Sequence, residues 1–407
     1  MSMNKPVVLD IFCGAGGMSE GFLQAGFDVA FAADLNETAK LTYTNRHKKL
    51  GHNVKFACMD IKLFADKEFL KGFLEDKSID VVCGGPPCQG FSLAGKRDKS
   101  DPRNMLFKSY IEVIKNVKPK YFLMENVEGL LSMEFDKFNG ISGEIYNNKT
   151  VPEILINEFL HIGYKVDYRV LSANDYGVPQ TRRRVFFIGH MIEKRPDGTY
   201  IDLVSPVDFP QRNIARDVTI KEAIDDLSFL EAGHKSKKYK KKCNSQYQLQ
   251  SREGRTPDIN GKGIKNKELH NHEASKHSDL VIKRFSLLNE GEDLETIKQR
   301  LNSDEWDKIK TKKLRCERVI GRLPSPTILT LPDDLVHYSK NRIMTVREFA
   351  RIQSFDDSFE FLGKRTTGGK LRKTDLPQYT QVGNAVPPLM AKAVAQEIFL
   401  AIQKTGK

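Results

Sequence analysis

The chain has 407 residues, 39% of them hydrophobic, a formal net charge of +12 and an isoelectric point of about 9.2. The sequence contains no run that approaches the roughly 18 consecutive apolar residues of a membrane span, which argues against an integral membrane protein. The length permits a large core and favours two domains. On charge alone, a polyanionic partner such as nucleic acid and a basic enzyme whose charge has no specific role are equally compatible.

Cysteine usage and the first residues bear on the cellular compartment. Six cysteines, at positions 13, 58, 83, 88, 243 and 316, are scattered without paired spacing. This pattern indicates reduced thiols rather than a disulfide framework. The first residues pass directly into a strand-like run without the features of a signal peptide. We therefore expect a cytoplasmic protein.

The first half of the chain alternates between strand-like and helix-like segments. Short apolar runs that end in glycines or polar residues predict buried strands at 7–12, 27–33, 79–83, 121–124, 164–171 and 185–188. Helical segments lie between them, for example at 18–25 and 104–117. This alternation predicts an α/β fold built on a doubly wound, mostly parallel sheet.

A glycine-rich turn at 14–17 separates the first predicted strand from the first helix. Such a turn brings the backbone close to a ligand and offers free N–H groups at a helix N-terminus. Asp34 follows Gly14 by 20 residues, a position suited to binding ribose hydroxyls. A dinucleotide site would require a third glycine where this chain has Ser19. The pattern suits S-adenosylmethionine better, and Asp60, after a third strand, supports a cofactor site.

A cysteine follows the predicted strand 79–83, within the sequence Gly-Gly-Pro-Pro-Cys-Gln-Gly-Phe-Ser of residues 84–92. Parallel sheets carry their functional residues at the carboxyl ends of strands. Prolines stiffen the loop before Cys88, and Gly90 permits a turn that a side chain would block. The loop therefore presents a thiol in the manner of a nucleophile, although most free cysteines are buried and structural.

The composition changes from about residue 194 to 330, where the sequence is polar, irregular and rich in lysine. Three histidines in this region, His270, His272 and His277, have no cysteine at ligand spacing, so we expect no metal site. Order returns with predicted helices at 345–352 and 387–402, the second of which begins with two prolines.

Five stretches of the chain occur together in one order, and each is moderately specific alone. They read Asp-Ile-Phe-Cys-Gly-Ala-Gly-Gly at 10–17, Pro-Pro-Cys-Gln-Gly-Phe-Ser at 86–92, Glu-Asn-Val at 125–127, Gln-Thr-Arg-Arg-Arg at 180–184 and Gln-Val-Gly-Asn-Ala-Val-Pro-Pro at 381–388. The set closely resembles the cytosine-5 DNA methyltransferase family, in its bacterial restriction–modification branch. The resemblance covers residues 5–190 and about 320–400.

The resemblance implies a catalytic set of four side chains. Cys88 matches the nucleophile that adds to carbon 6 of cytosine and so activates carbon 5 toward the methyl group. Glu125 matches the residue that hydrogen-bonds and protonates nitrogen 3, a role that requires a raised pKa. Arg184 matches the arginine that binds oxygen 2. Arg182 matches its companion, placed nearer the catalytic loop or the phosphates.

The resemblance also implies the binding residues and the domain order. S-adenosylmethionine is held by Phe12, Gly14, Gly16, Gly17, Asp34, Leu35, Asp60, Ile61, Pro87, Leu106, Asn384 and Ala385. DNA is contacted by Gln89, Ser92, Arg97, Arg103, Lys237, Lys238, Lys240 and Lys241. The stretch from Ser92 to Met105 resembles the loop that closes over a flipped-out base. Residues 1–193 form the catalytic domain, 194–375 an inserted, irregular target-recognition domain, and 376–407 a segment that returns to the catalytic domain.

The predicted function is therefore site-specific methylation of cytosine carbon 5 in duplex DNA by a monomer. A separate restriction endonuclease is a potential partner, and no membrane is involved. Two alternatives in the same family are a tRNA cytosine-5 methyltransferase, which typically has a Cys-Phe-Thr motif absent here, and a non-catalytic DNA-binding member, which would lack Cys88 or Glu125. A nicotinamide oxidoreductase is disfavoured by Ser19. One departure from the family stands at 355–357, where Phe-Asp-Asp replaces Phe-Pro-Asp, and we expect it to affect domain packing.

Overall fold

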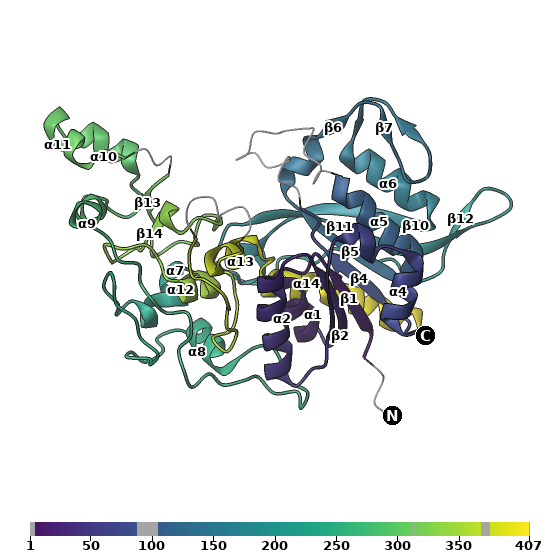
Figure 1. Ribbon diagram of the computed structural model, residues 1–407, viewed down its shortest axis with the longest axis horizontal. Helices are drawn as coiled ribbons and strands as arrows, with labels where there is room; N and C mark the ends of the chain where they lie inside the picture. The colour runs from purple at the N-terminus through teal and green to yellow at the C-terminus, as the bar shows by residue number, and fades with distance from the viewer. Residues whose placement is uncertain (1–4, 88–104, 312–314, 368–374, 407) are drawn as a thin grey trace.

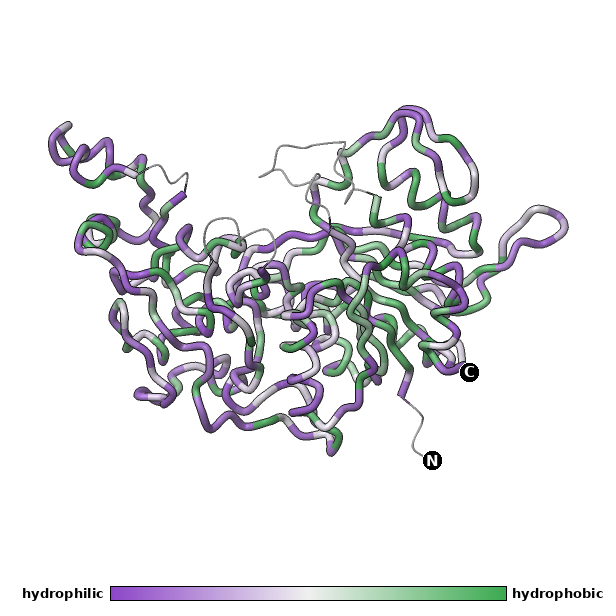
Figure 2. Tube along the Cα trace, viewed as in Figure 1, coloured by the Kyte–Doolittle hydropathy of each residue, from purple (hydrophilic) through white to green (hydrophobic). Residues whose placement is uncertain are grey.

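The computed structural model describes residues 5–87, 105–311, 315–367 and 375–406. Figure 1 shows a sheet covered by helices at one end of the molecule and, at the other, mostly irregular chain with short helices, of which α10 and α11 lie farthest from the sheet. Figure 2 shows hydrophobic residues concentrated along the sheet and more hydrophilic chain in the irregular part. We refer to the first as the sheet part and to the second, which contains the short helices between Ile220 and Asn384, as the small part.

The main sheet has the strand order β10-β11-β5-β4-β1-β2-β3, with β12 paired to β11. The parallel strands are β1 (Val7–Ile11), β2 (Asp28–Asp34), β3 (Lys55–Cys58), β4 (Val81–Gly84) and β5 (Tyr121–Asn126). Antiparallel strands β10 (Tyr164–Ser172), β11 (Arg183–Lys194) and β12 (Tyr200–Asp202) complete it. The mostly parallel α/β sheet is as predicted. The link between β10 and β11 is too short for a crossover helix, so these strands must run antiparallel.

Helices cover both faces of the sheet because successive strand residues alternate between two cores. Leu9 and Ile11 of β1 face a core with α3 (Ile61–Phe64), α4 (Lys67–Leu74), α5 (Leu106–Val117) and α6 (Val151–His161). Val8 faces the opposite core, with α1 (Gly17–Gln24) and α14 (Pro388–Thr405), and the C-terminal end of α2 (Glu37–Leu50) contributes to it. Short strands β6 (Glu134–Phe135), β7 (Phe138–Asn139), β8 (Ile145–Tyr146) and β9 (Lys149–Thr150) form two small hairpin-like pairs after the single turn of η2 (Glu128–Ser132).

The last helix packs closely against the first. A Cβ atom on Gly21 of α1 would lie 2.5 Å from the Cβ of Ala391 in α14, so only glycine permits this approach. Among the described residues, Gln378–Thr405 is the one helical stretch long and apolar enough to cross a membrane, and 56% of its most apolar window is buried inside the protein. The burial against α1 explains its apolar character. The two ends of the described chain thus complete one core.

The small part contains short helices joined by irregular chain. They are α7 (Ile220–Ile224), α8 (Gln246–Glu253), α9 (Asp279–Ser286), α10 (Leu294–Arg300), α11 (Ser303–Ile309), α12 (Val346–Ile352) and α13 (Gln378–Asn384), with the short strand pair β13 (Glu317–Arg318) and β14 (Leu335–Val336) and the turns η4 (Asp225–Leu227) and η5 (Pro332–Asp334). The turn η3 (Ala173–Tyr176), between β10 and β11, belongs to the core of the sheet part. An aromatic and aliphatic core lies under α7, α12 and α13.

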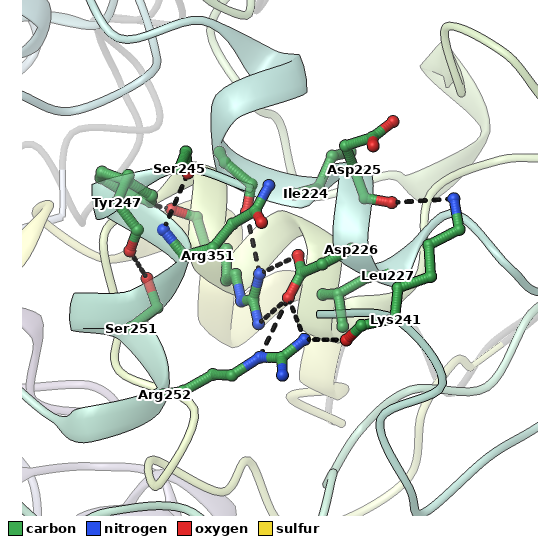
Figure 3. Close-up of polar contacts among 12 residues, drawn as sticks. Ile224, Asp225, Asp226, Leu227, Lys241, Ser245, Tyr247, Ser251, Arg252 and Arg351 are labelled. Carbon is green, nitrogen blue, oxygen red and sulfur yellow. Dashed lines mark hydrogen bonds and ion pairs between the residues drawn. The ribbon is translucent and has the colours of Figure 1, made fainter. Parts of the chain in front are cut away.

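Buried ion pairs supplement this core, as Figure 3 shows around Arg351. The Arg351 guanidinium donates to Asp226 Oδ1 at 2.5 Å and to Asp357 Oδ2 at 2.7 Å, and all three side chains are buried. Arg252 donates to the same Asp226 carboxylate. Buried charges are tolerated only when they are paired and fully hydrogen-bonded, so this network fixes how the irregular segments meet.

The aspartate at the position of the family's proline contributes to domain packing. Asp356 Oδ2 accepts the backbone N–H groups of Arg255 and Thr256, at 2.7 and 2.9 Å, and Oδ1 accepts from the Arg255 guanidinium. It also lies 3.8 Å from Arg46 of α2, which pairs with Glu20 of α1. The carboxylate therefore joins the small part to the sheet part through contacts that a proline could not make.

We predict that Glu348→Gln destabilises the protein by about 3–5 kcal/mol near neutral pH, because it leaves the buried Arg342 unpaired. Glu348 receives two 2.8 Å hydrogen bonds from Arg342 and caps α12 through Thr345 N. Burial by itself would raise the pKa of Glu348, but Arg342 outweighs burial and lowers it to about 2. The folded-state pKa lies below the unfolded value, so the stabilisation is present above about pH 4.3 and is lost as pH falls toward 2.

Urea unfolding of wild type and variant between pH 3 and 8 measures this effect. Glu153→Gln is the matched control, because Glu153 occupies the same capping-box position of α6 but is exposed and pairs with Lys149. We expect a much smaller loss from it. Equal losses in the two variants would show that capping, and not the buried ion pair, accounts for the stability.

Candidate functional site

A cleft of about 1910 Å³ opens where the carboxyl ends of β1, β2, β4 and β5 meet the small part. Ligand sites of open α/β sheets lie at this edge. The cleft brings together most of the predicted site residues: Phe12, Gly14, Gly17, Asp34, Leu35, Asp60, Ile61, Pro87, Leu106, Glu125, Arg182, Arg184, Asn384 and Ala385. Cys88, Gln89, Ser92, Arg97 and Arg103 lie outside the described residues.

The glycine turn has a backbone that side chains would obstruct. Phe12, Gly14 and Gly16 all have positive φ, at 54°, 53° and 99°. A Cβ on Gly16 would meet the Tyr43 ring at 2.9 Å, and one on Gly17 would meet Val386 O at 2.2 Å. The turn therefore packs between α2 and the segment before α14, and Gly16 supports it from behind without lining the cleft.

Asp34 fixes the turn from the neighbouring strand. Its Oδ2 accepts a 2.9 Å hydrogen bond from Gly14 N, and its Oδ1 accepts from Asn36 N at 2.9 Å. Burial raises the pKa of Asp34, and these backbone hydrogen bonds oppose the shift. The carboxylate, which the sequence suggested for ribose hydroxyls, thus also holds the Gly14 loop.

Asp10 is a site residue whose role the sequence did not reveal. It lies in β1 and lines the cleft, where Ser19 Oγ donates to its Oδ2 at 2.5 Å. Its Oδ1 is buried and has no hydrogen-bond partner in the described part of the chain. Burial raises the pKa of Asp10 to about 7. An unpaired buried acceptor beside a glycine turn suits a cationic ligand group such as the ammonium of an amino acid, but an aspartate in a buried strand gives no such signal in the sequence.

The remaining wall of this half of the cleft is apolar. Leu35, Met59, Ile61 and Leu106 line it, and Leu35 is 71% exposed. Apolar side chains next to a carboxylate-fixed turn are the surroundings that a nucleoside with an attached amino acid requires. The residues present therefore fit S-adenosylmethionine.

We predict that Asp34→Ala weakens binding of S-adenosylhomocysteine by about 1–3 kcal/mol, because it removes a charged acceptor and releases Gly14 N. Calorimetric titration measures the affinity. Asp66→Ala is the control, since Asp66 caps α4 through Phe69 N on an exposed surface. Unchanged affinity in Asp34→Ala would contradict the placement of the cofactor on this turn.

The other half of the cleft contains a carboxyl group, Glu125, beside a cation, Arg184. Glu125 is the penultimate residue of β5, is 8% exposed, and its Oε1 lies 3.0 Å from Arg184 Nε of β11. Burial raises the pKa of Glu125, while the charges of Arg184 and Arg182 limit the rise. A carboxyl with a raised pKa can donate a proton nearer to neutral pH than an exposed one.

Strand alternation separates the arginines of the 182–184 triplet. Arg184 points to Glu125, whereas the exposed Arg183 pairs with Glu128 at 2.9 Å. Arg182 is buried and donates to Gly383 O at 3.0 Å, which places it in the interior rather than on the surface. The triplet is thus not a solvated charge run.

The loop before residue 88 approaches the acid. Asn126 Nδ2 donates to Pro86 O at 3.1 Å, and a Cβ on Gly85 would lie 3.0 Å from Glu125 Oε2. Pro87, the last described residue before the gap, lines the cleft. The chain is therefore within the site one residue before Cys88.

The four lysines predicted to bind DNA do not line the cleft. Lys237 lies 3.0 Å from Glu268, Lys241 Nζ donates to Asp225 O at 3.3 Å, and Lys240 lies over the Phe229 ring. The wall that the small part contributes to the cleft has other cations, namely Lys276, Arg315 and Arg365. The sequence did not mark these three, because they are isolated from one another along the chain.

The histidines have structural surroundings. His272 is buried between Thr345 Oγ1 and Leu227 O, at 3.0 and 3.1 Å, and burial lowers its pKa to about 4. Within the described ranges no three histidine, cysteine or acidic side chains gather in a way that could hold a metal ion.

Comparison with known proteins places this geometry in a family. A sequence model described as C-5 cytosine-specific DNA methylase matches residues 7–400. The Type II methyltransferase M.DdeI of Desulfomicrobium norvegicum is 37% identical, over 96% of this chain and 88% of that protein. The Type II methyltransferase M1.HphI of Haemophilus parahaemolyticus is 34% identical, over 96% and 86%.

Solved structures share the fold. A prophage-encoded protein of E. coli, described as a DNA modification methyltransferase, superposes with a TM-score of 0.71 at 24% identity, over 98% of this chain and 100% of that one. The methyltransferase EhMeth of Entamoeba histolytica gives a TM-score of 0.56 at 15% identity, over 98% of each chain. At these identities the likeness concerns the fold alone.

Proposed function

This chain belongs to the C-5 cytosine-specific DNA methylase family, and from that membership we propose which residues perform its reaction. It is a DNA (cytosine-5)-methyltransferase whose methyl donor is S-adenosylmethionine. The observation that carries the assignment of roles is the Glu125–Arg184 pair, 3.0 Å apart, in the same cleft as the glycine turn. Acid, cation and cofactor cradle thus face one space.

In the proposed mechanism the Cys88 thiolate forms a bond to carbon 6 of the target cytosine. Electron density moves toward nitrogen 3 and oxygen 2, where Glu125 supplies a proton and Arg184 a positive charge. S-adenosylmethionine, when bound, would supply the methyl group from its sulfonium to carbon 5 and would leave as S-adenosylhomocysteine. Loss of the carbon 5 proton to a base, breakage of the sulfur–carbon 6 bond and return of the nitrogen 3 proton to Glu125 release 5-methylcytosine and restore both Cys88 and Glu125.

The cofactor would lie along the apolar wall with its amino-acid end at the glycine turn. The donors and acceptors that we assign to it are the turn at 14–17, Asp34, Asp60, and the Asn384–Ala385 loop. The unpaired Asp10 Oδ1 suits its ammonium group. These residues bind and orient, and the surrounding apolar side chains exclude water from the reacting atoms.

The target base must leave the duplex to enter this cleft, since its carbon 6 is inaccessible in stacked DNA. We propose that the loop with Gln89, Ser92, Arg97 and Arg103 contacts the flipped strand. The division into residues 1–193, 194–375 and 376–407 stays a proposal, with the middle segment reading the sequence. We also propose that the protein is a monomer that works in the cytoplasm, close to the nucleoid, with a separately acting restriction endonuclease as its partner system.

Bisulfite sequencing of plasmid DNA from cells that express the protein tests the function. We expect full protection of one cytosine within a short recurring sequence. A duplex that carries 5-fluorocytosine at this site should form an adduct that survives denaturation, because fluorine cannot leave carbon 5 as a proton does. Absence of methylation at every site would refute the proposed activity for this chain.

Phosphate binding has two sets of candidate cations, which salt dependence separates. Each phosphate contact contributes about 0.9 to the slope of log affinity against log salt. We expect alanine at Lys276 and Arg315 to lower this slope by about 1.8, and alanine at Lys237, Lys238, Lys240 and Lys241 to lower it further without changing the methylated sequence. Filter binding to cognate and random duplexes at several salt concentrations measures the slope of each variant, and bisulfite sequencing reports the methylated sequence. A wild-type slope in the lysine variant would assign those four lysines to a solvated face.

A further inference from the structure

Two buried glutamines lie between the two halves of the cleft. Gln180 and Gln353 have no exposed surface, and Gln180 Nε2 donates to Gln353 Oε1 at 2.5 Å. They are 173 residues apart in the chain. Neither lines the cleft, so neither can touch substrate or cofactor directly.

Gln180 holds the segment that leads to the target side of the site. Its Oε1 accepts from Ile328 N at 2.9 Å, and the flanking backbone pairs with Ser325 through Pro179 O and Thr181 N, each at 2.9 Å. The chain then continues into β11 and reaches Arg184 four residues later. The start of β11 is thus fixed by side chain and backbone together.

Gln353 holds the loop on the cofactor side. Its Nε2 donates to Val382 O at 2.8 Å and to Ala385 O at 3.0 Å, across the turn that carries Asn384 and Ala385. Arg182 makes a parallel connection, because its guanidinium donates to Gly383 O. The backbone carbonyls of residues 382 and 385 are therefore held by Gln353, and the carbonyl of residue 383 is held by Arg182.

The chemistry requires carboxamides at both positions. Gln353 uses its oxygen as an acceptor and its nitrogen as a double donor, and Gln180 uses one of each. Every alternative side chain of this size loses a donor or an acceptor in a fully buried position, where an unmade hydrogen bond is costly.

We propose that the Gln180–Gln353 pair is a positioning unit that sets Arg184 and the Asn384–Ala385 loop relative to one another. Through it the target pocket and the cofactor pocket share one buried hydrogen-bond chain. This inference rests on the proposed roles of Arg184 and of the Asn384–Ala385 loop. It assigns to Gln180 an effect on cofactor affinity, although Gln180 makes no contact with the cofactor loop.

The test measures S-adenosylhomocysteine affinity by calorimetry and single-turnover methyl transfer in four variants. We expect Gln353→Met to weaken binding about fivefold to tenfold, the loss typical of a broken buried hydrogen bond. Gln180→Met should weaken it in the same direction and also slow methyl transfer. The double variant should bind no more weakly than Gln353→Met alone, because both substitutions break one chain of contacts.

Gln248→Met is the matched control for loss of a buried amide. Gln248 has no exposed surface and joins Asn244 N to Lys221 O within the small part, away from the cleft. It should lower the unfolding temperature yet leave affinity and rate unchanged. Wild-type affinity in Gln180→Met, additive losses in the double variant, or equal losses in the control would each overturn the positioning role. A wild-type protein that neither binds S-adenosylhomocysteine nor methylates DNA would instead refute the proposed function, and this inference with it.

Discussion

Cys88→Ser should reduce methyl transfer at least about 10³-fold, because a serine hydroxyl is not ionised where a thiol of pKa ~8.5 can be. The Cys88 thiolate itself forms the bond to carbon 6, so neither water nor additional binding energy can take its place. Binding of S-adenosylhomocysteine should persist, since the glycine turn, Asp34 and the apolar wall are unchanged. Single-turnover transfer of a radiolabelled methyl group to a cognate duplex measures the loss.

Cys243→Ser is the control for the cysteine substitution. Cys243 lies in the small part, half-buried, and burial raises the pKa of its thiol. We expect full activity and a normal 5-fluorocytosine adduct from this variant, and neither from Cys88→Ser. More than a few per cent of wild-type turnover in Cys88→Ser would contradict covalent catalysis through this residue.

Arg184→Met should lower the rate of methyl transfer about 10²–10³-fold, the effect of removing one preorganised donor from a site of developing negative charge. Methionine keeps the length and apolar contacts of the side chain while it removes the guanidinium. Arg183→Met is a control one residue away, on the opposite face of β11, where Arg183 pairs with exposed Glu128. The control should retain wild-type rates.

The same variant predicts a shift in pH dependence. Arg184 lowers the pKa of Glu125 against the effect of burial, so its loss should let that pKa rise further. Protonated Glu125 is the active form, and activity is lost as pH rises through its pKa. The alkaline limb of the rate profile should therefore move to higher pH in Arg184→Met. A limb that stays in place, or moves to lower pH, would mean that Glu125 is not the group that titrates.

Much of the sheet part was predictable because its signals are local. Each buried strand is a short apolar run, as at 121–126, and the glycine turn at 14–17 marks the start of α1. The segments β6–β9 were not predicted, since strands of two residues carry no periodicity. In the small part, α12 was predicted at 345–352, whereas α7 was missed, because the chain around it is held by long-range contacts such as the ion pair of Arg351 with Asp226, and these leave no mark in a local window.

In the site, too, features with a local sequence signal were predictable and features that depend on long-range contacts were not. The glycine turn and the acid at position 34 follow from spacing within one βαβ unit. The pairing of Glu125 with Arg184 does not, because it depends on β11 lying antiparallel beside β5, and the 58 intervening residues do not indicate that register. The roles of Asp10 and of the two glutamines could not be predicted from the sequence for a further reason. Their importance lies in which hydrogen bonds they make or leave unmade, and that is decided only when distant segments meet.

The close packing of α14 on α1 has a consequence for how the protein is made. Gly21 and Ala391, and the loop with Asn384 and Ala385, place the final segment inside a unit that the first residues begin. The ribosome releases the glycine turn at 14–17 early, whereas its partners Asn384 and Ala385 leave the exit tunnel only after several hundred further residues have been synthesised. The nascent chain therefore has exposed apolar strands but no complete cofactor pocket. We therefore expect methylating activity only from chains in which the Asn384–Ala385 loop and α14 have emerged and packed on α1, and none from a chain truncated before residue 390.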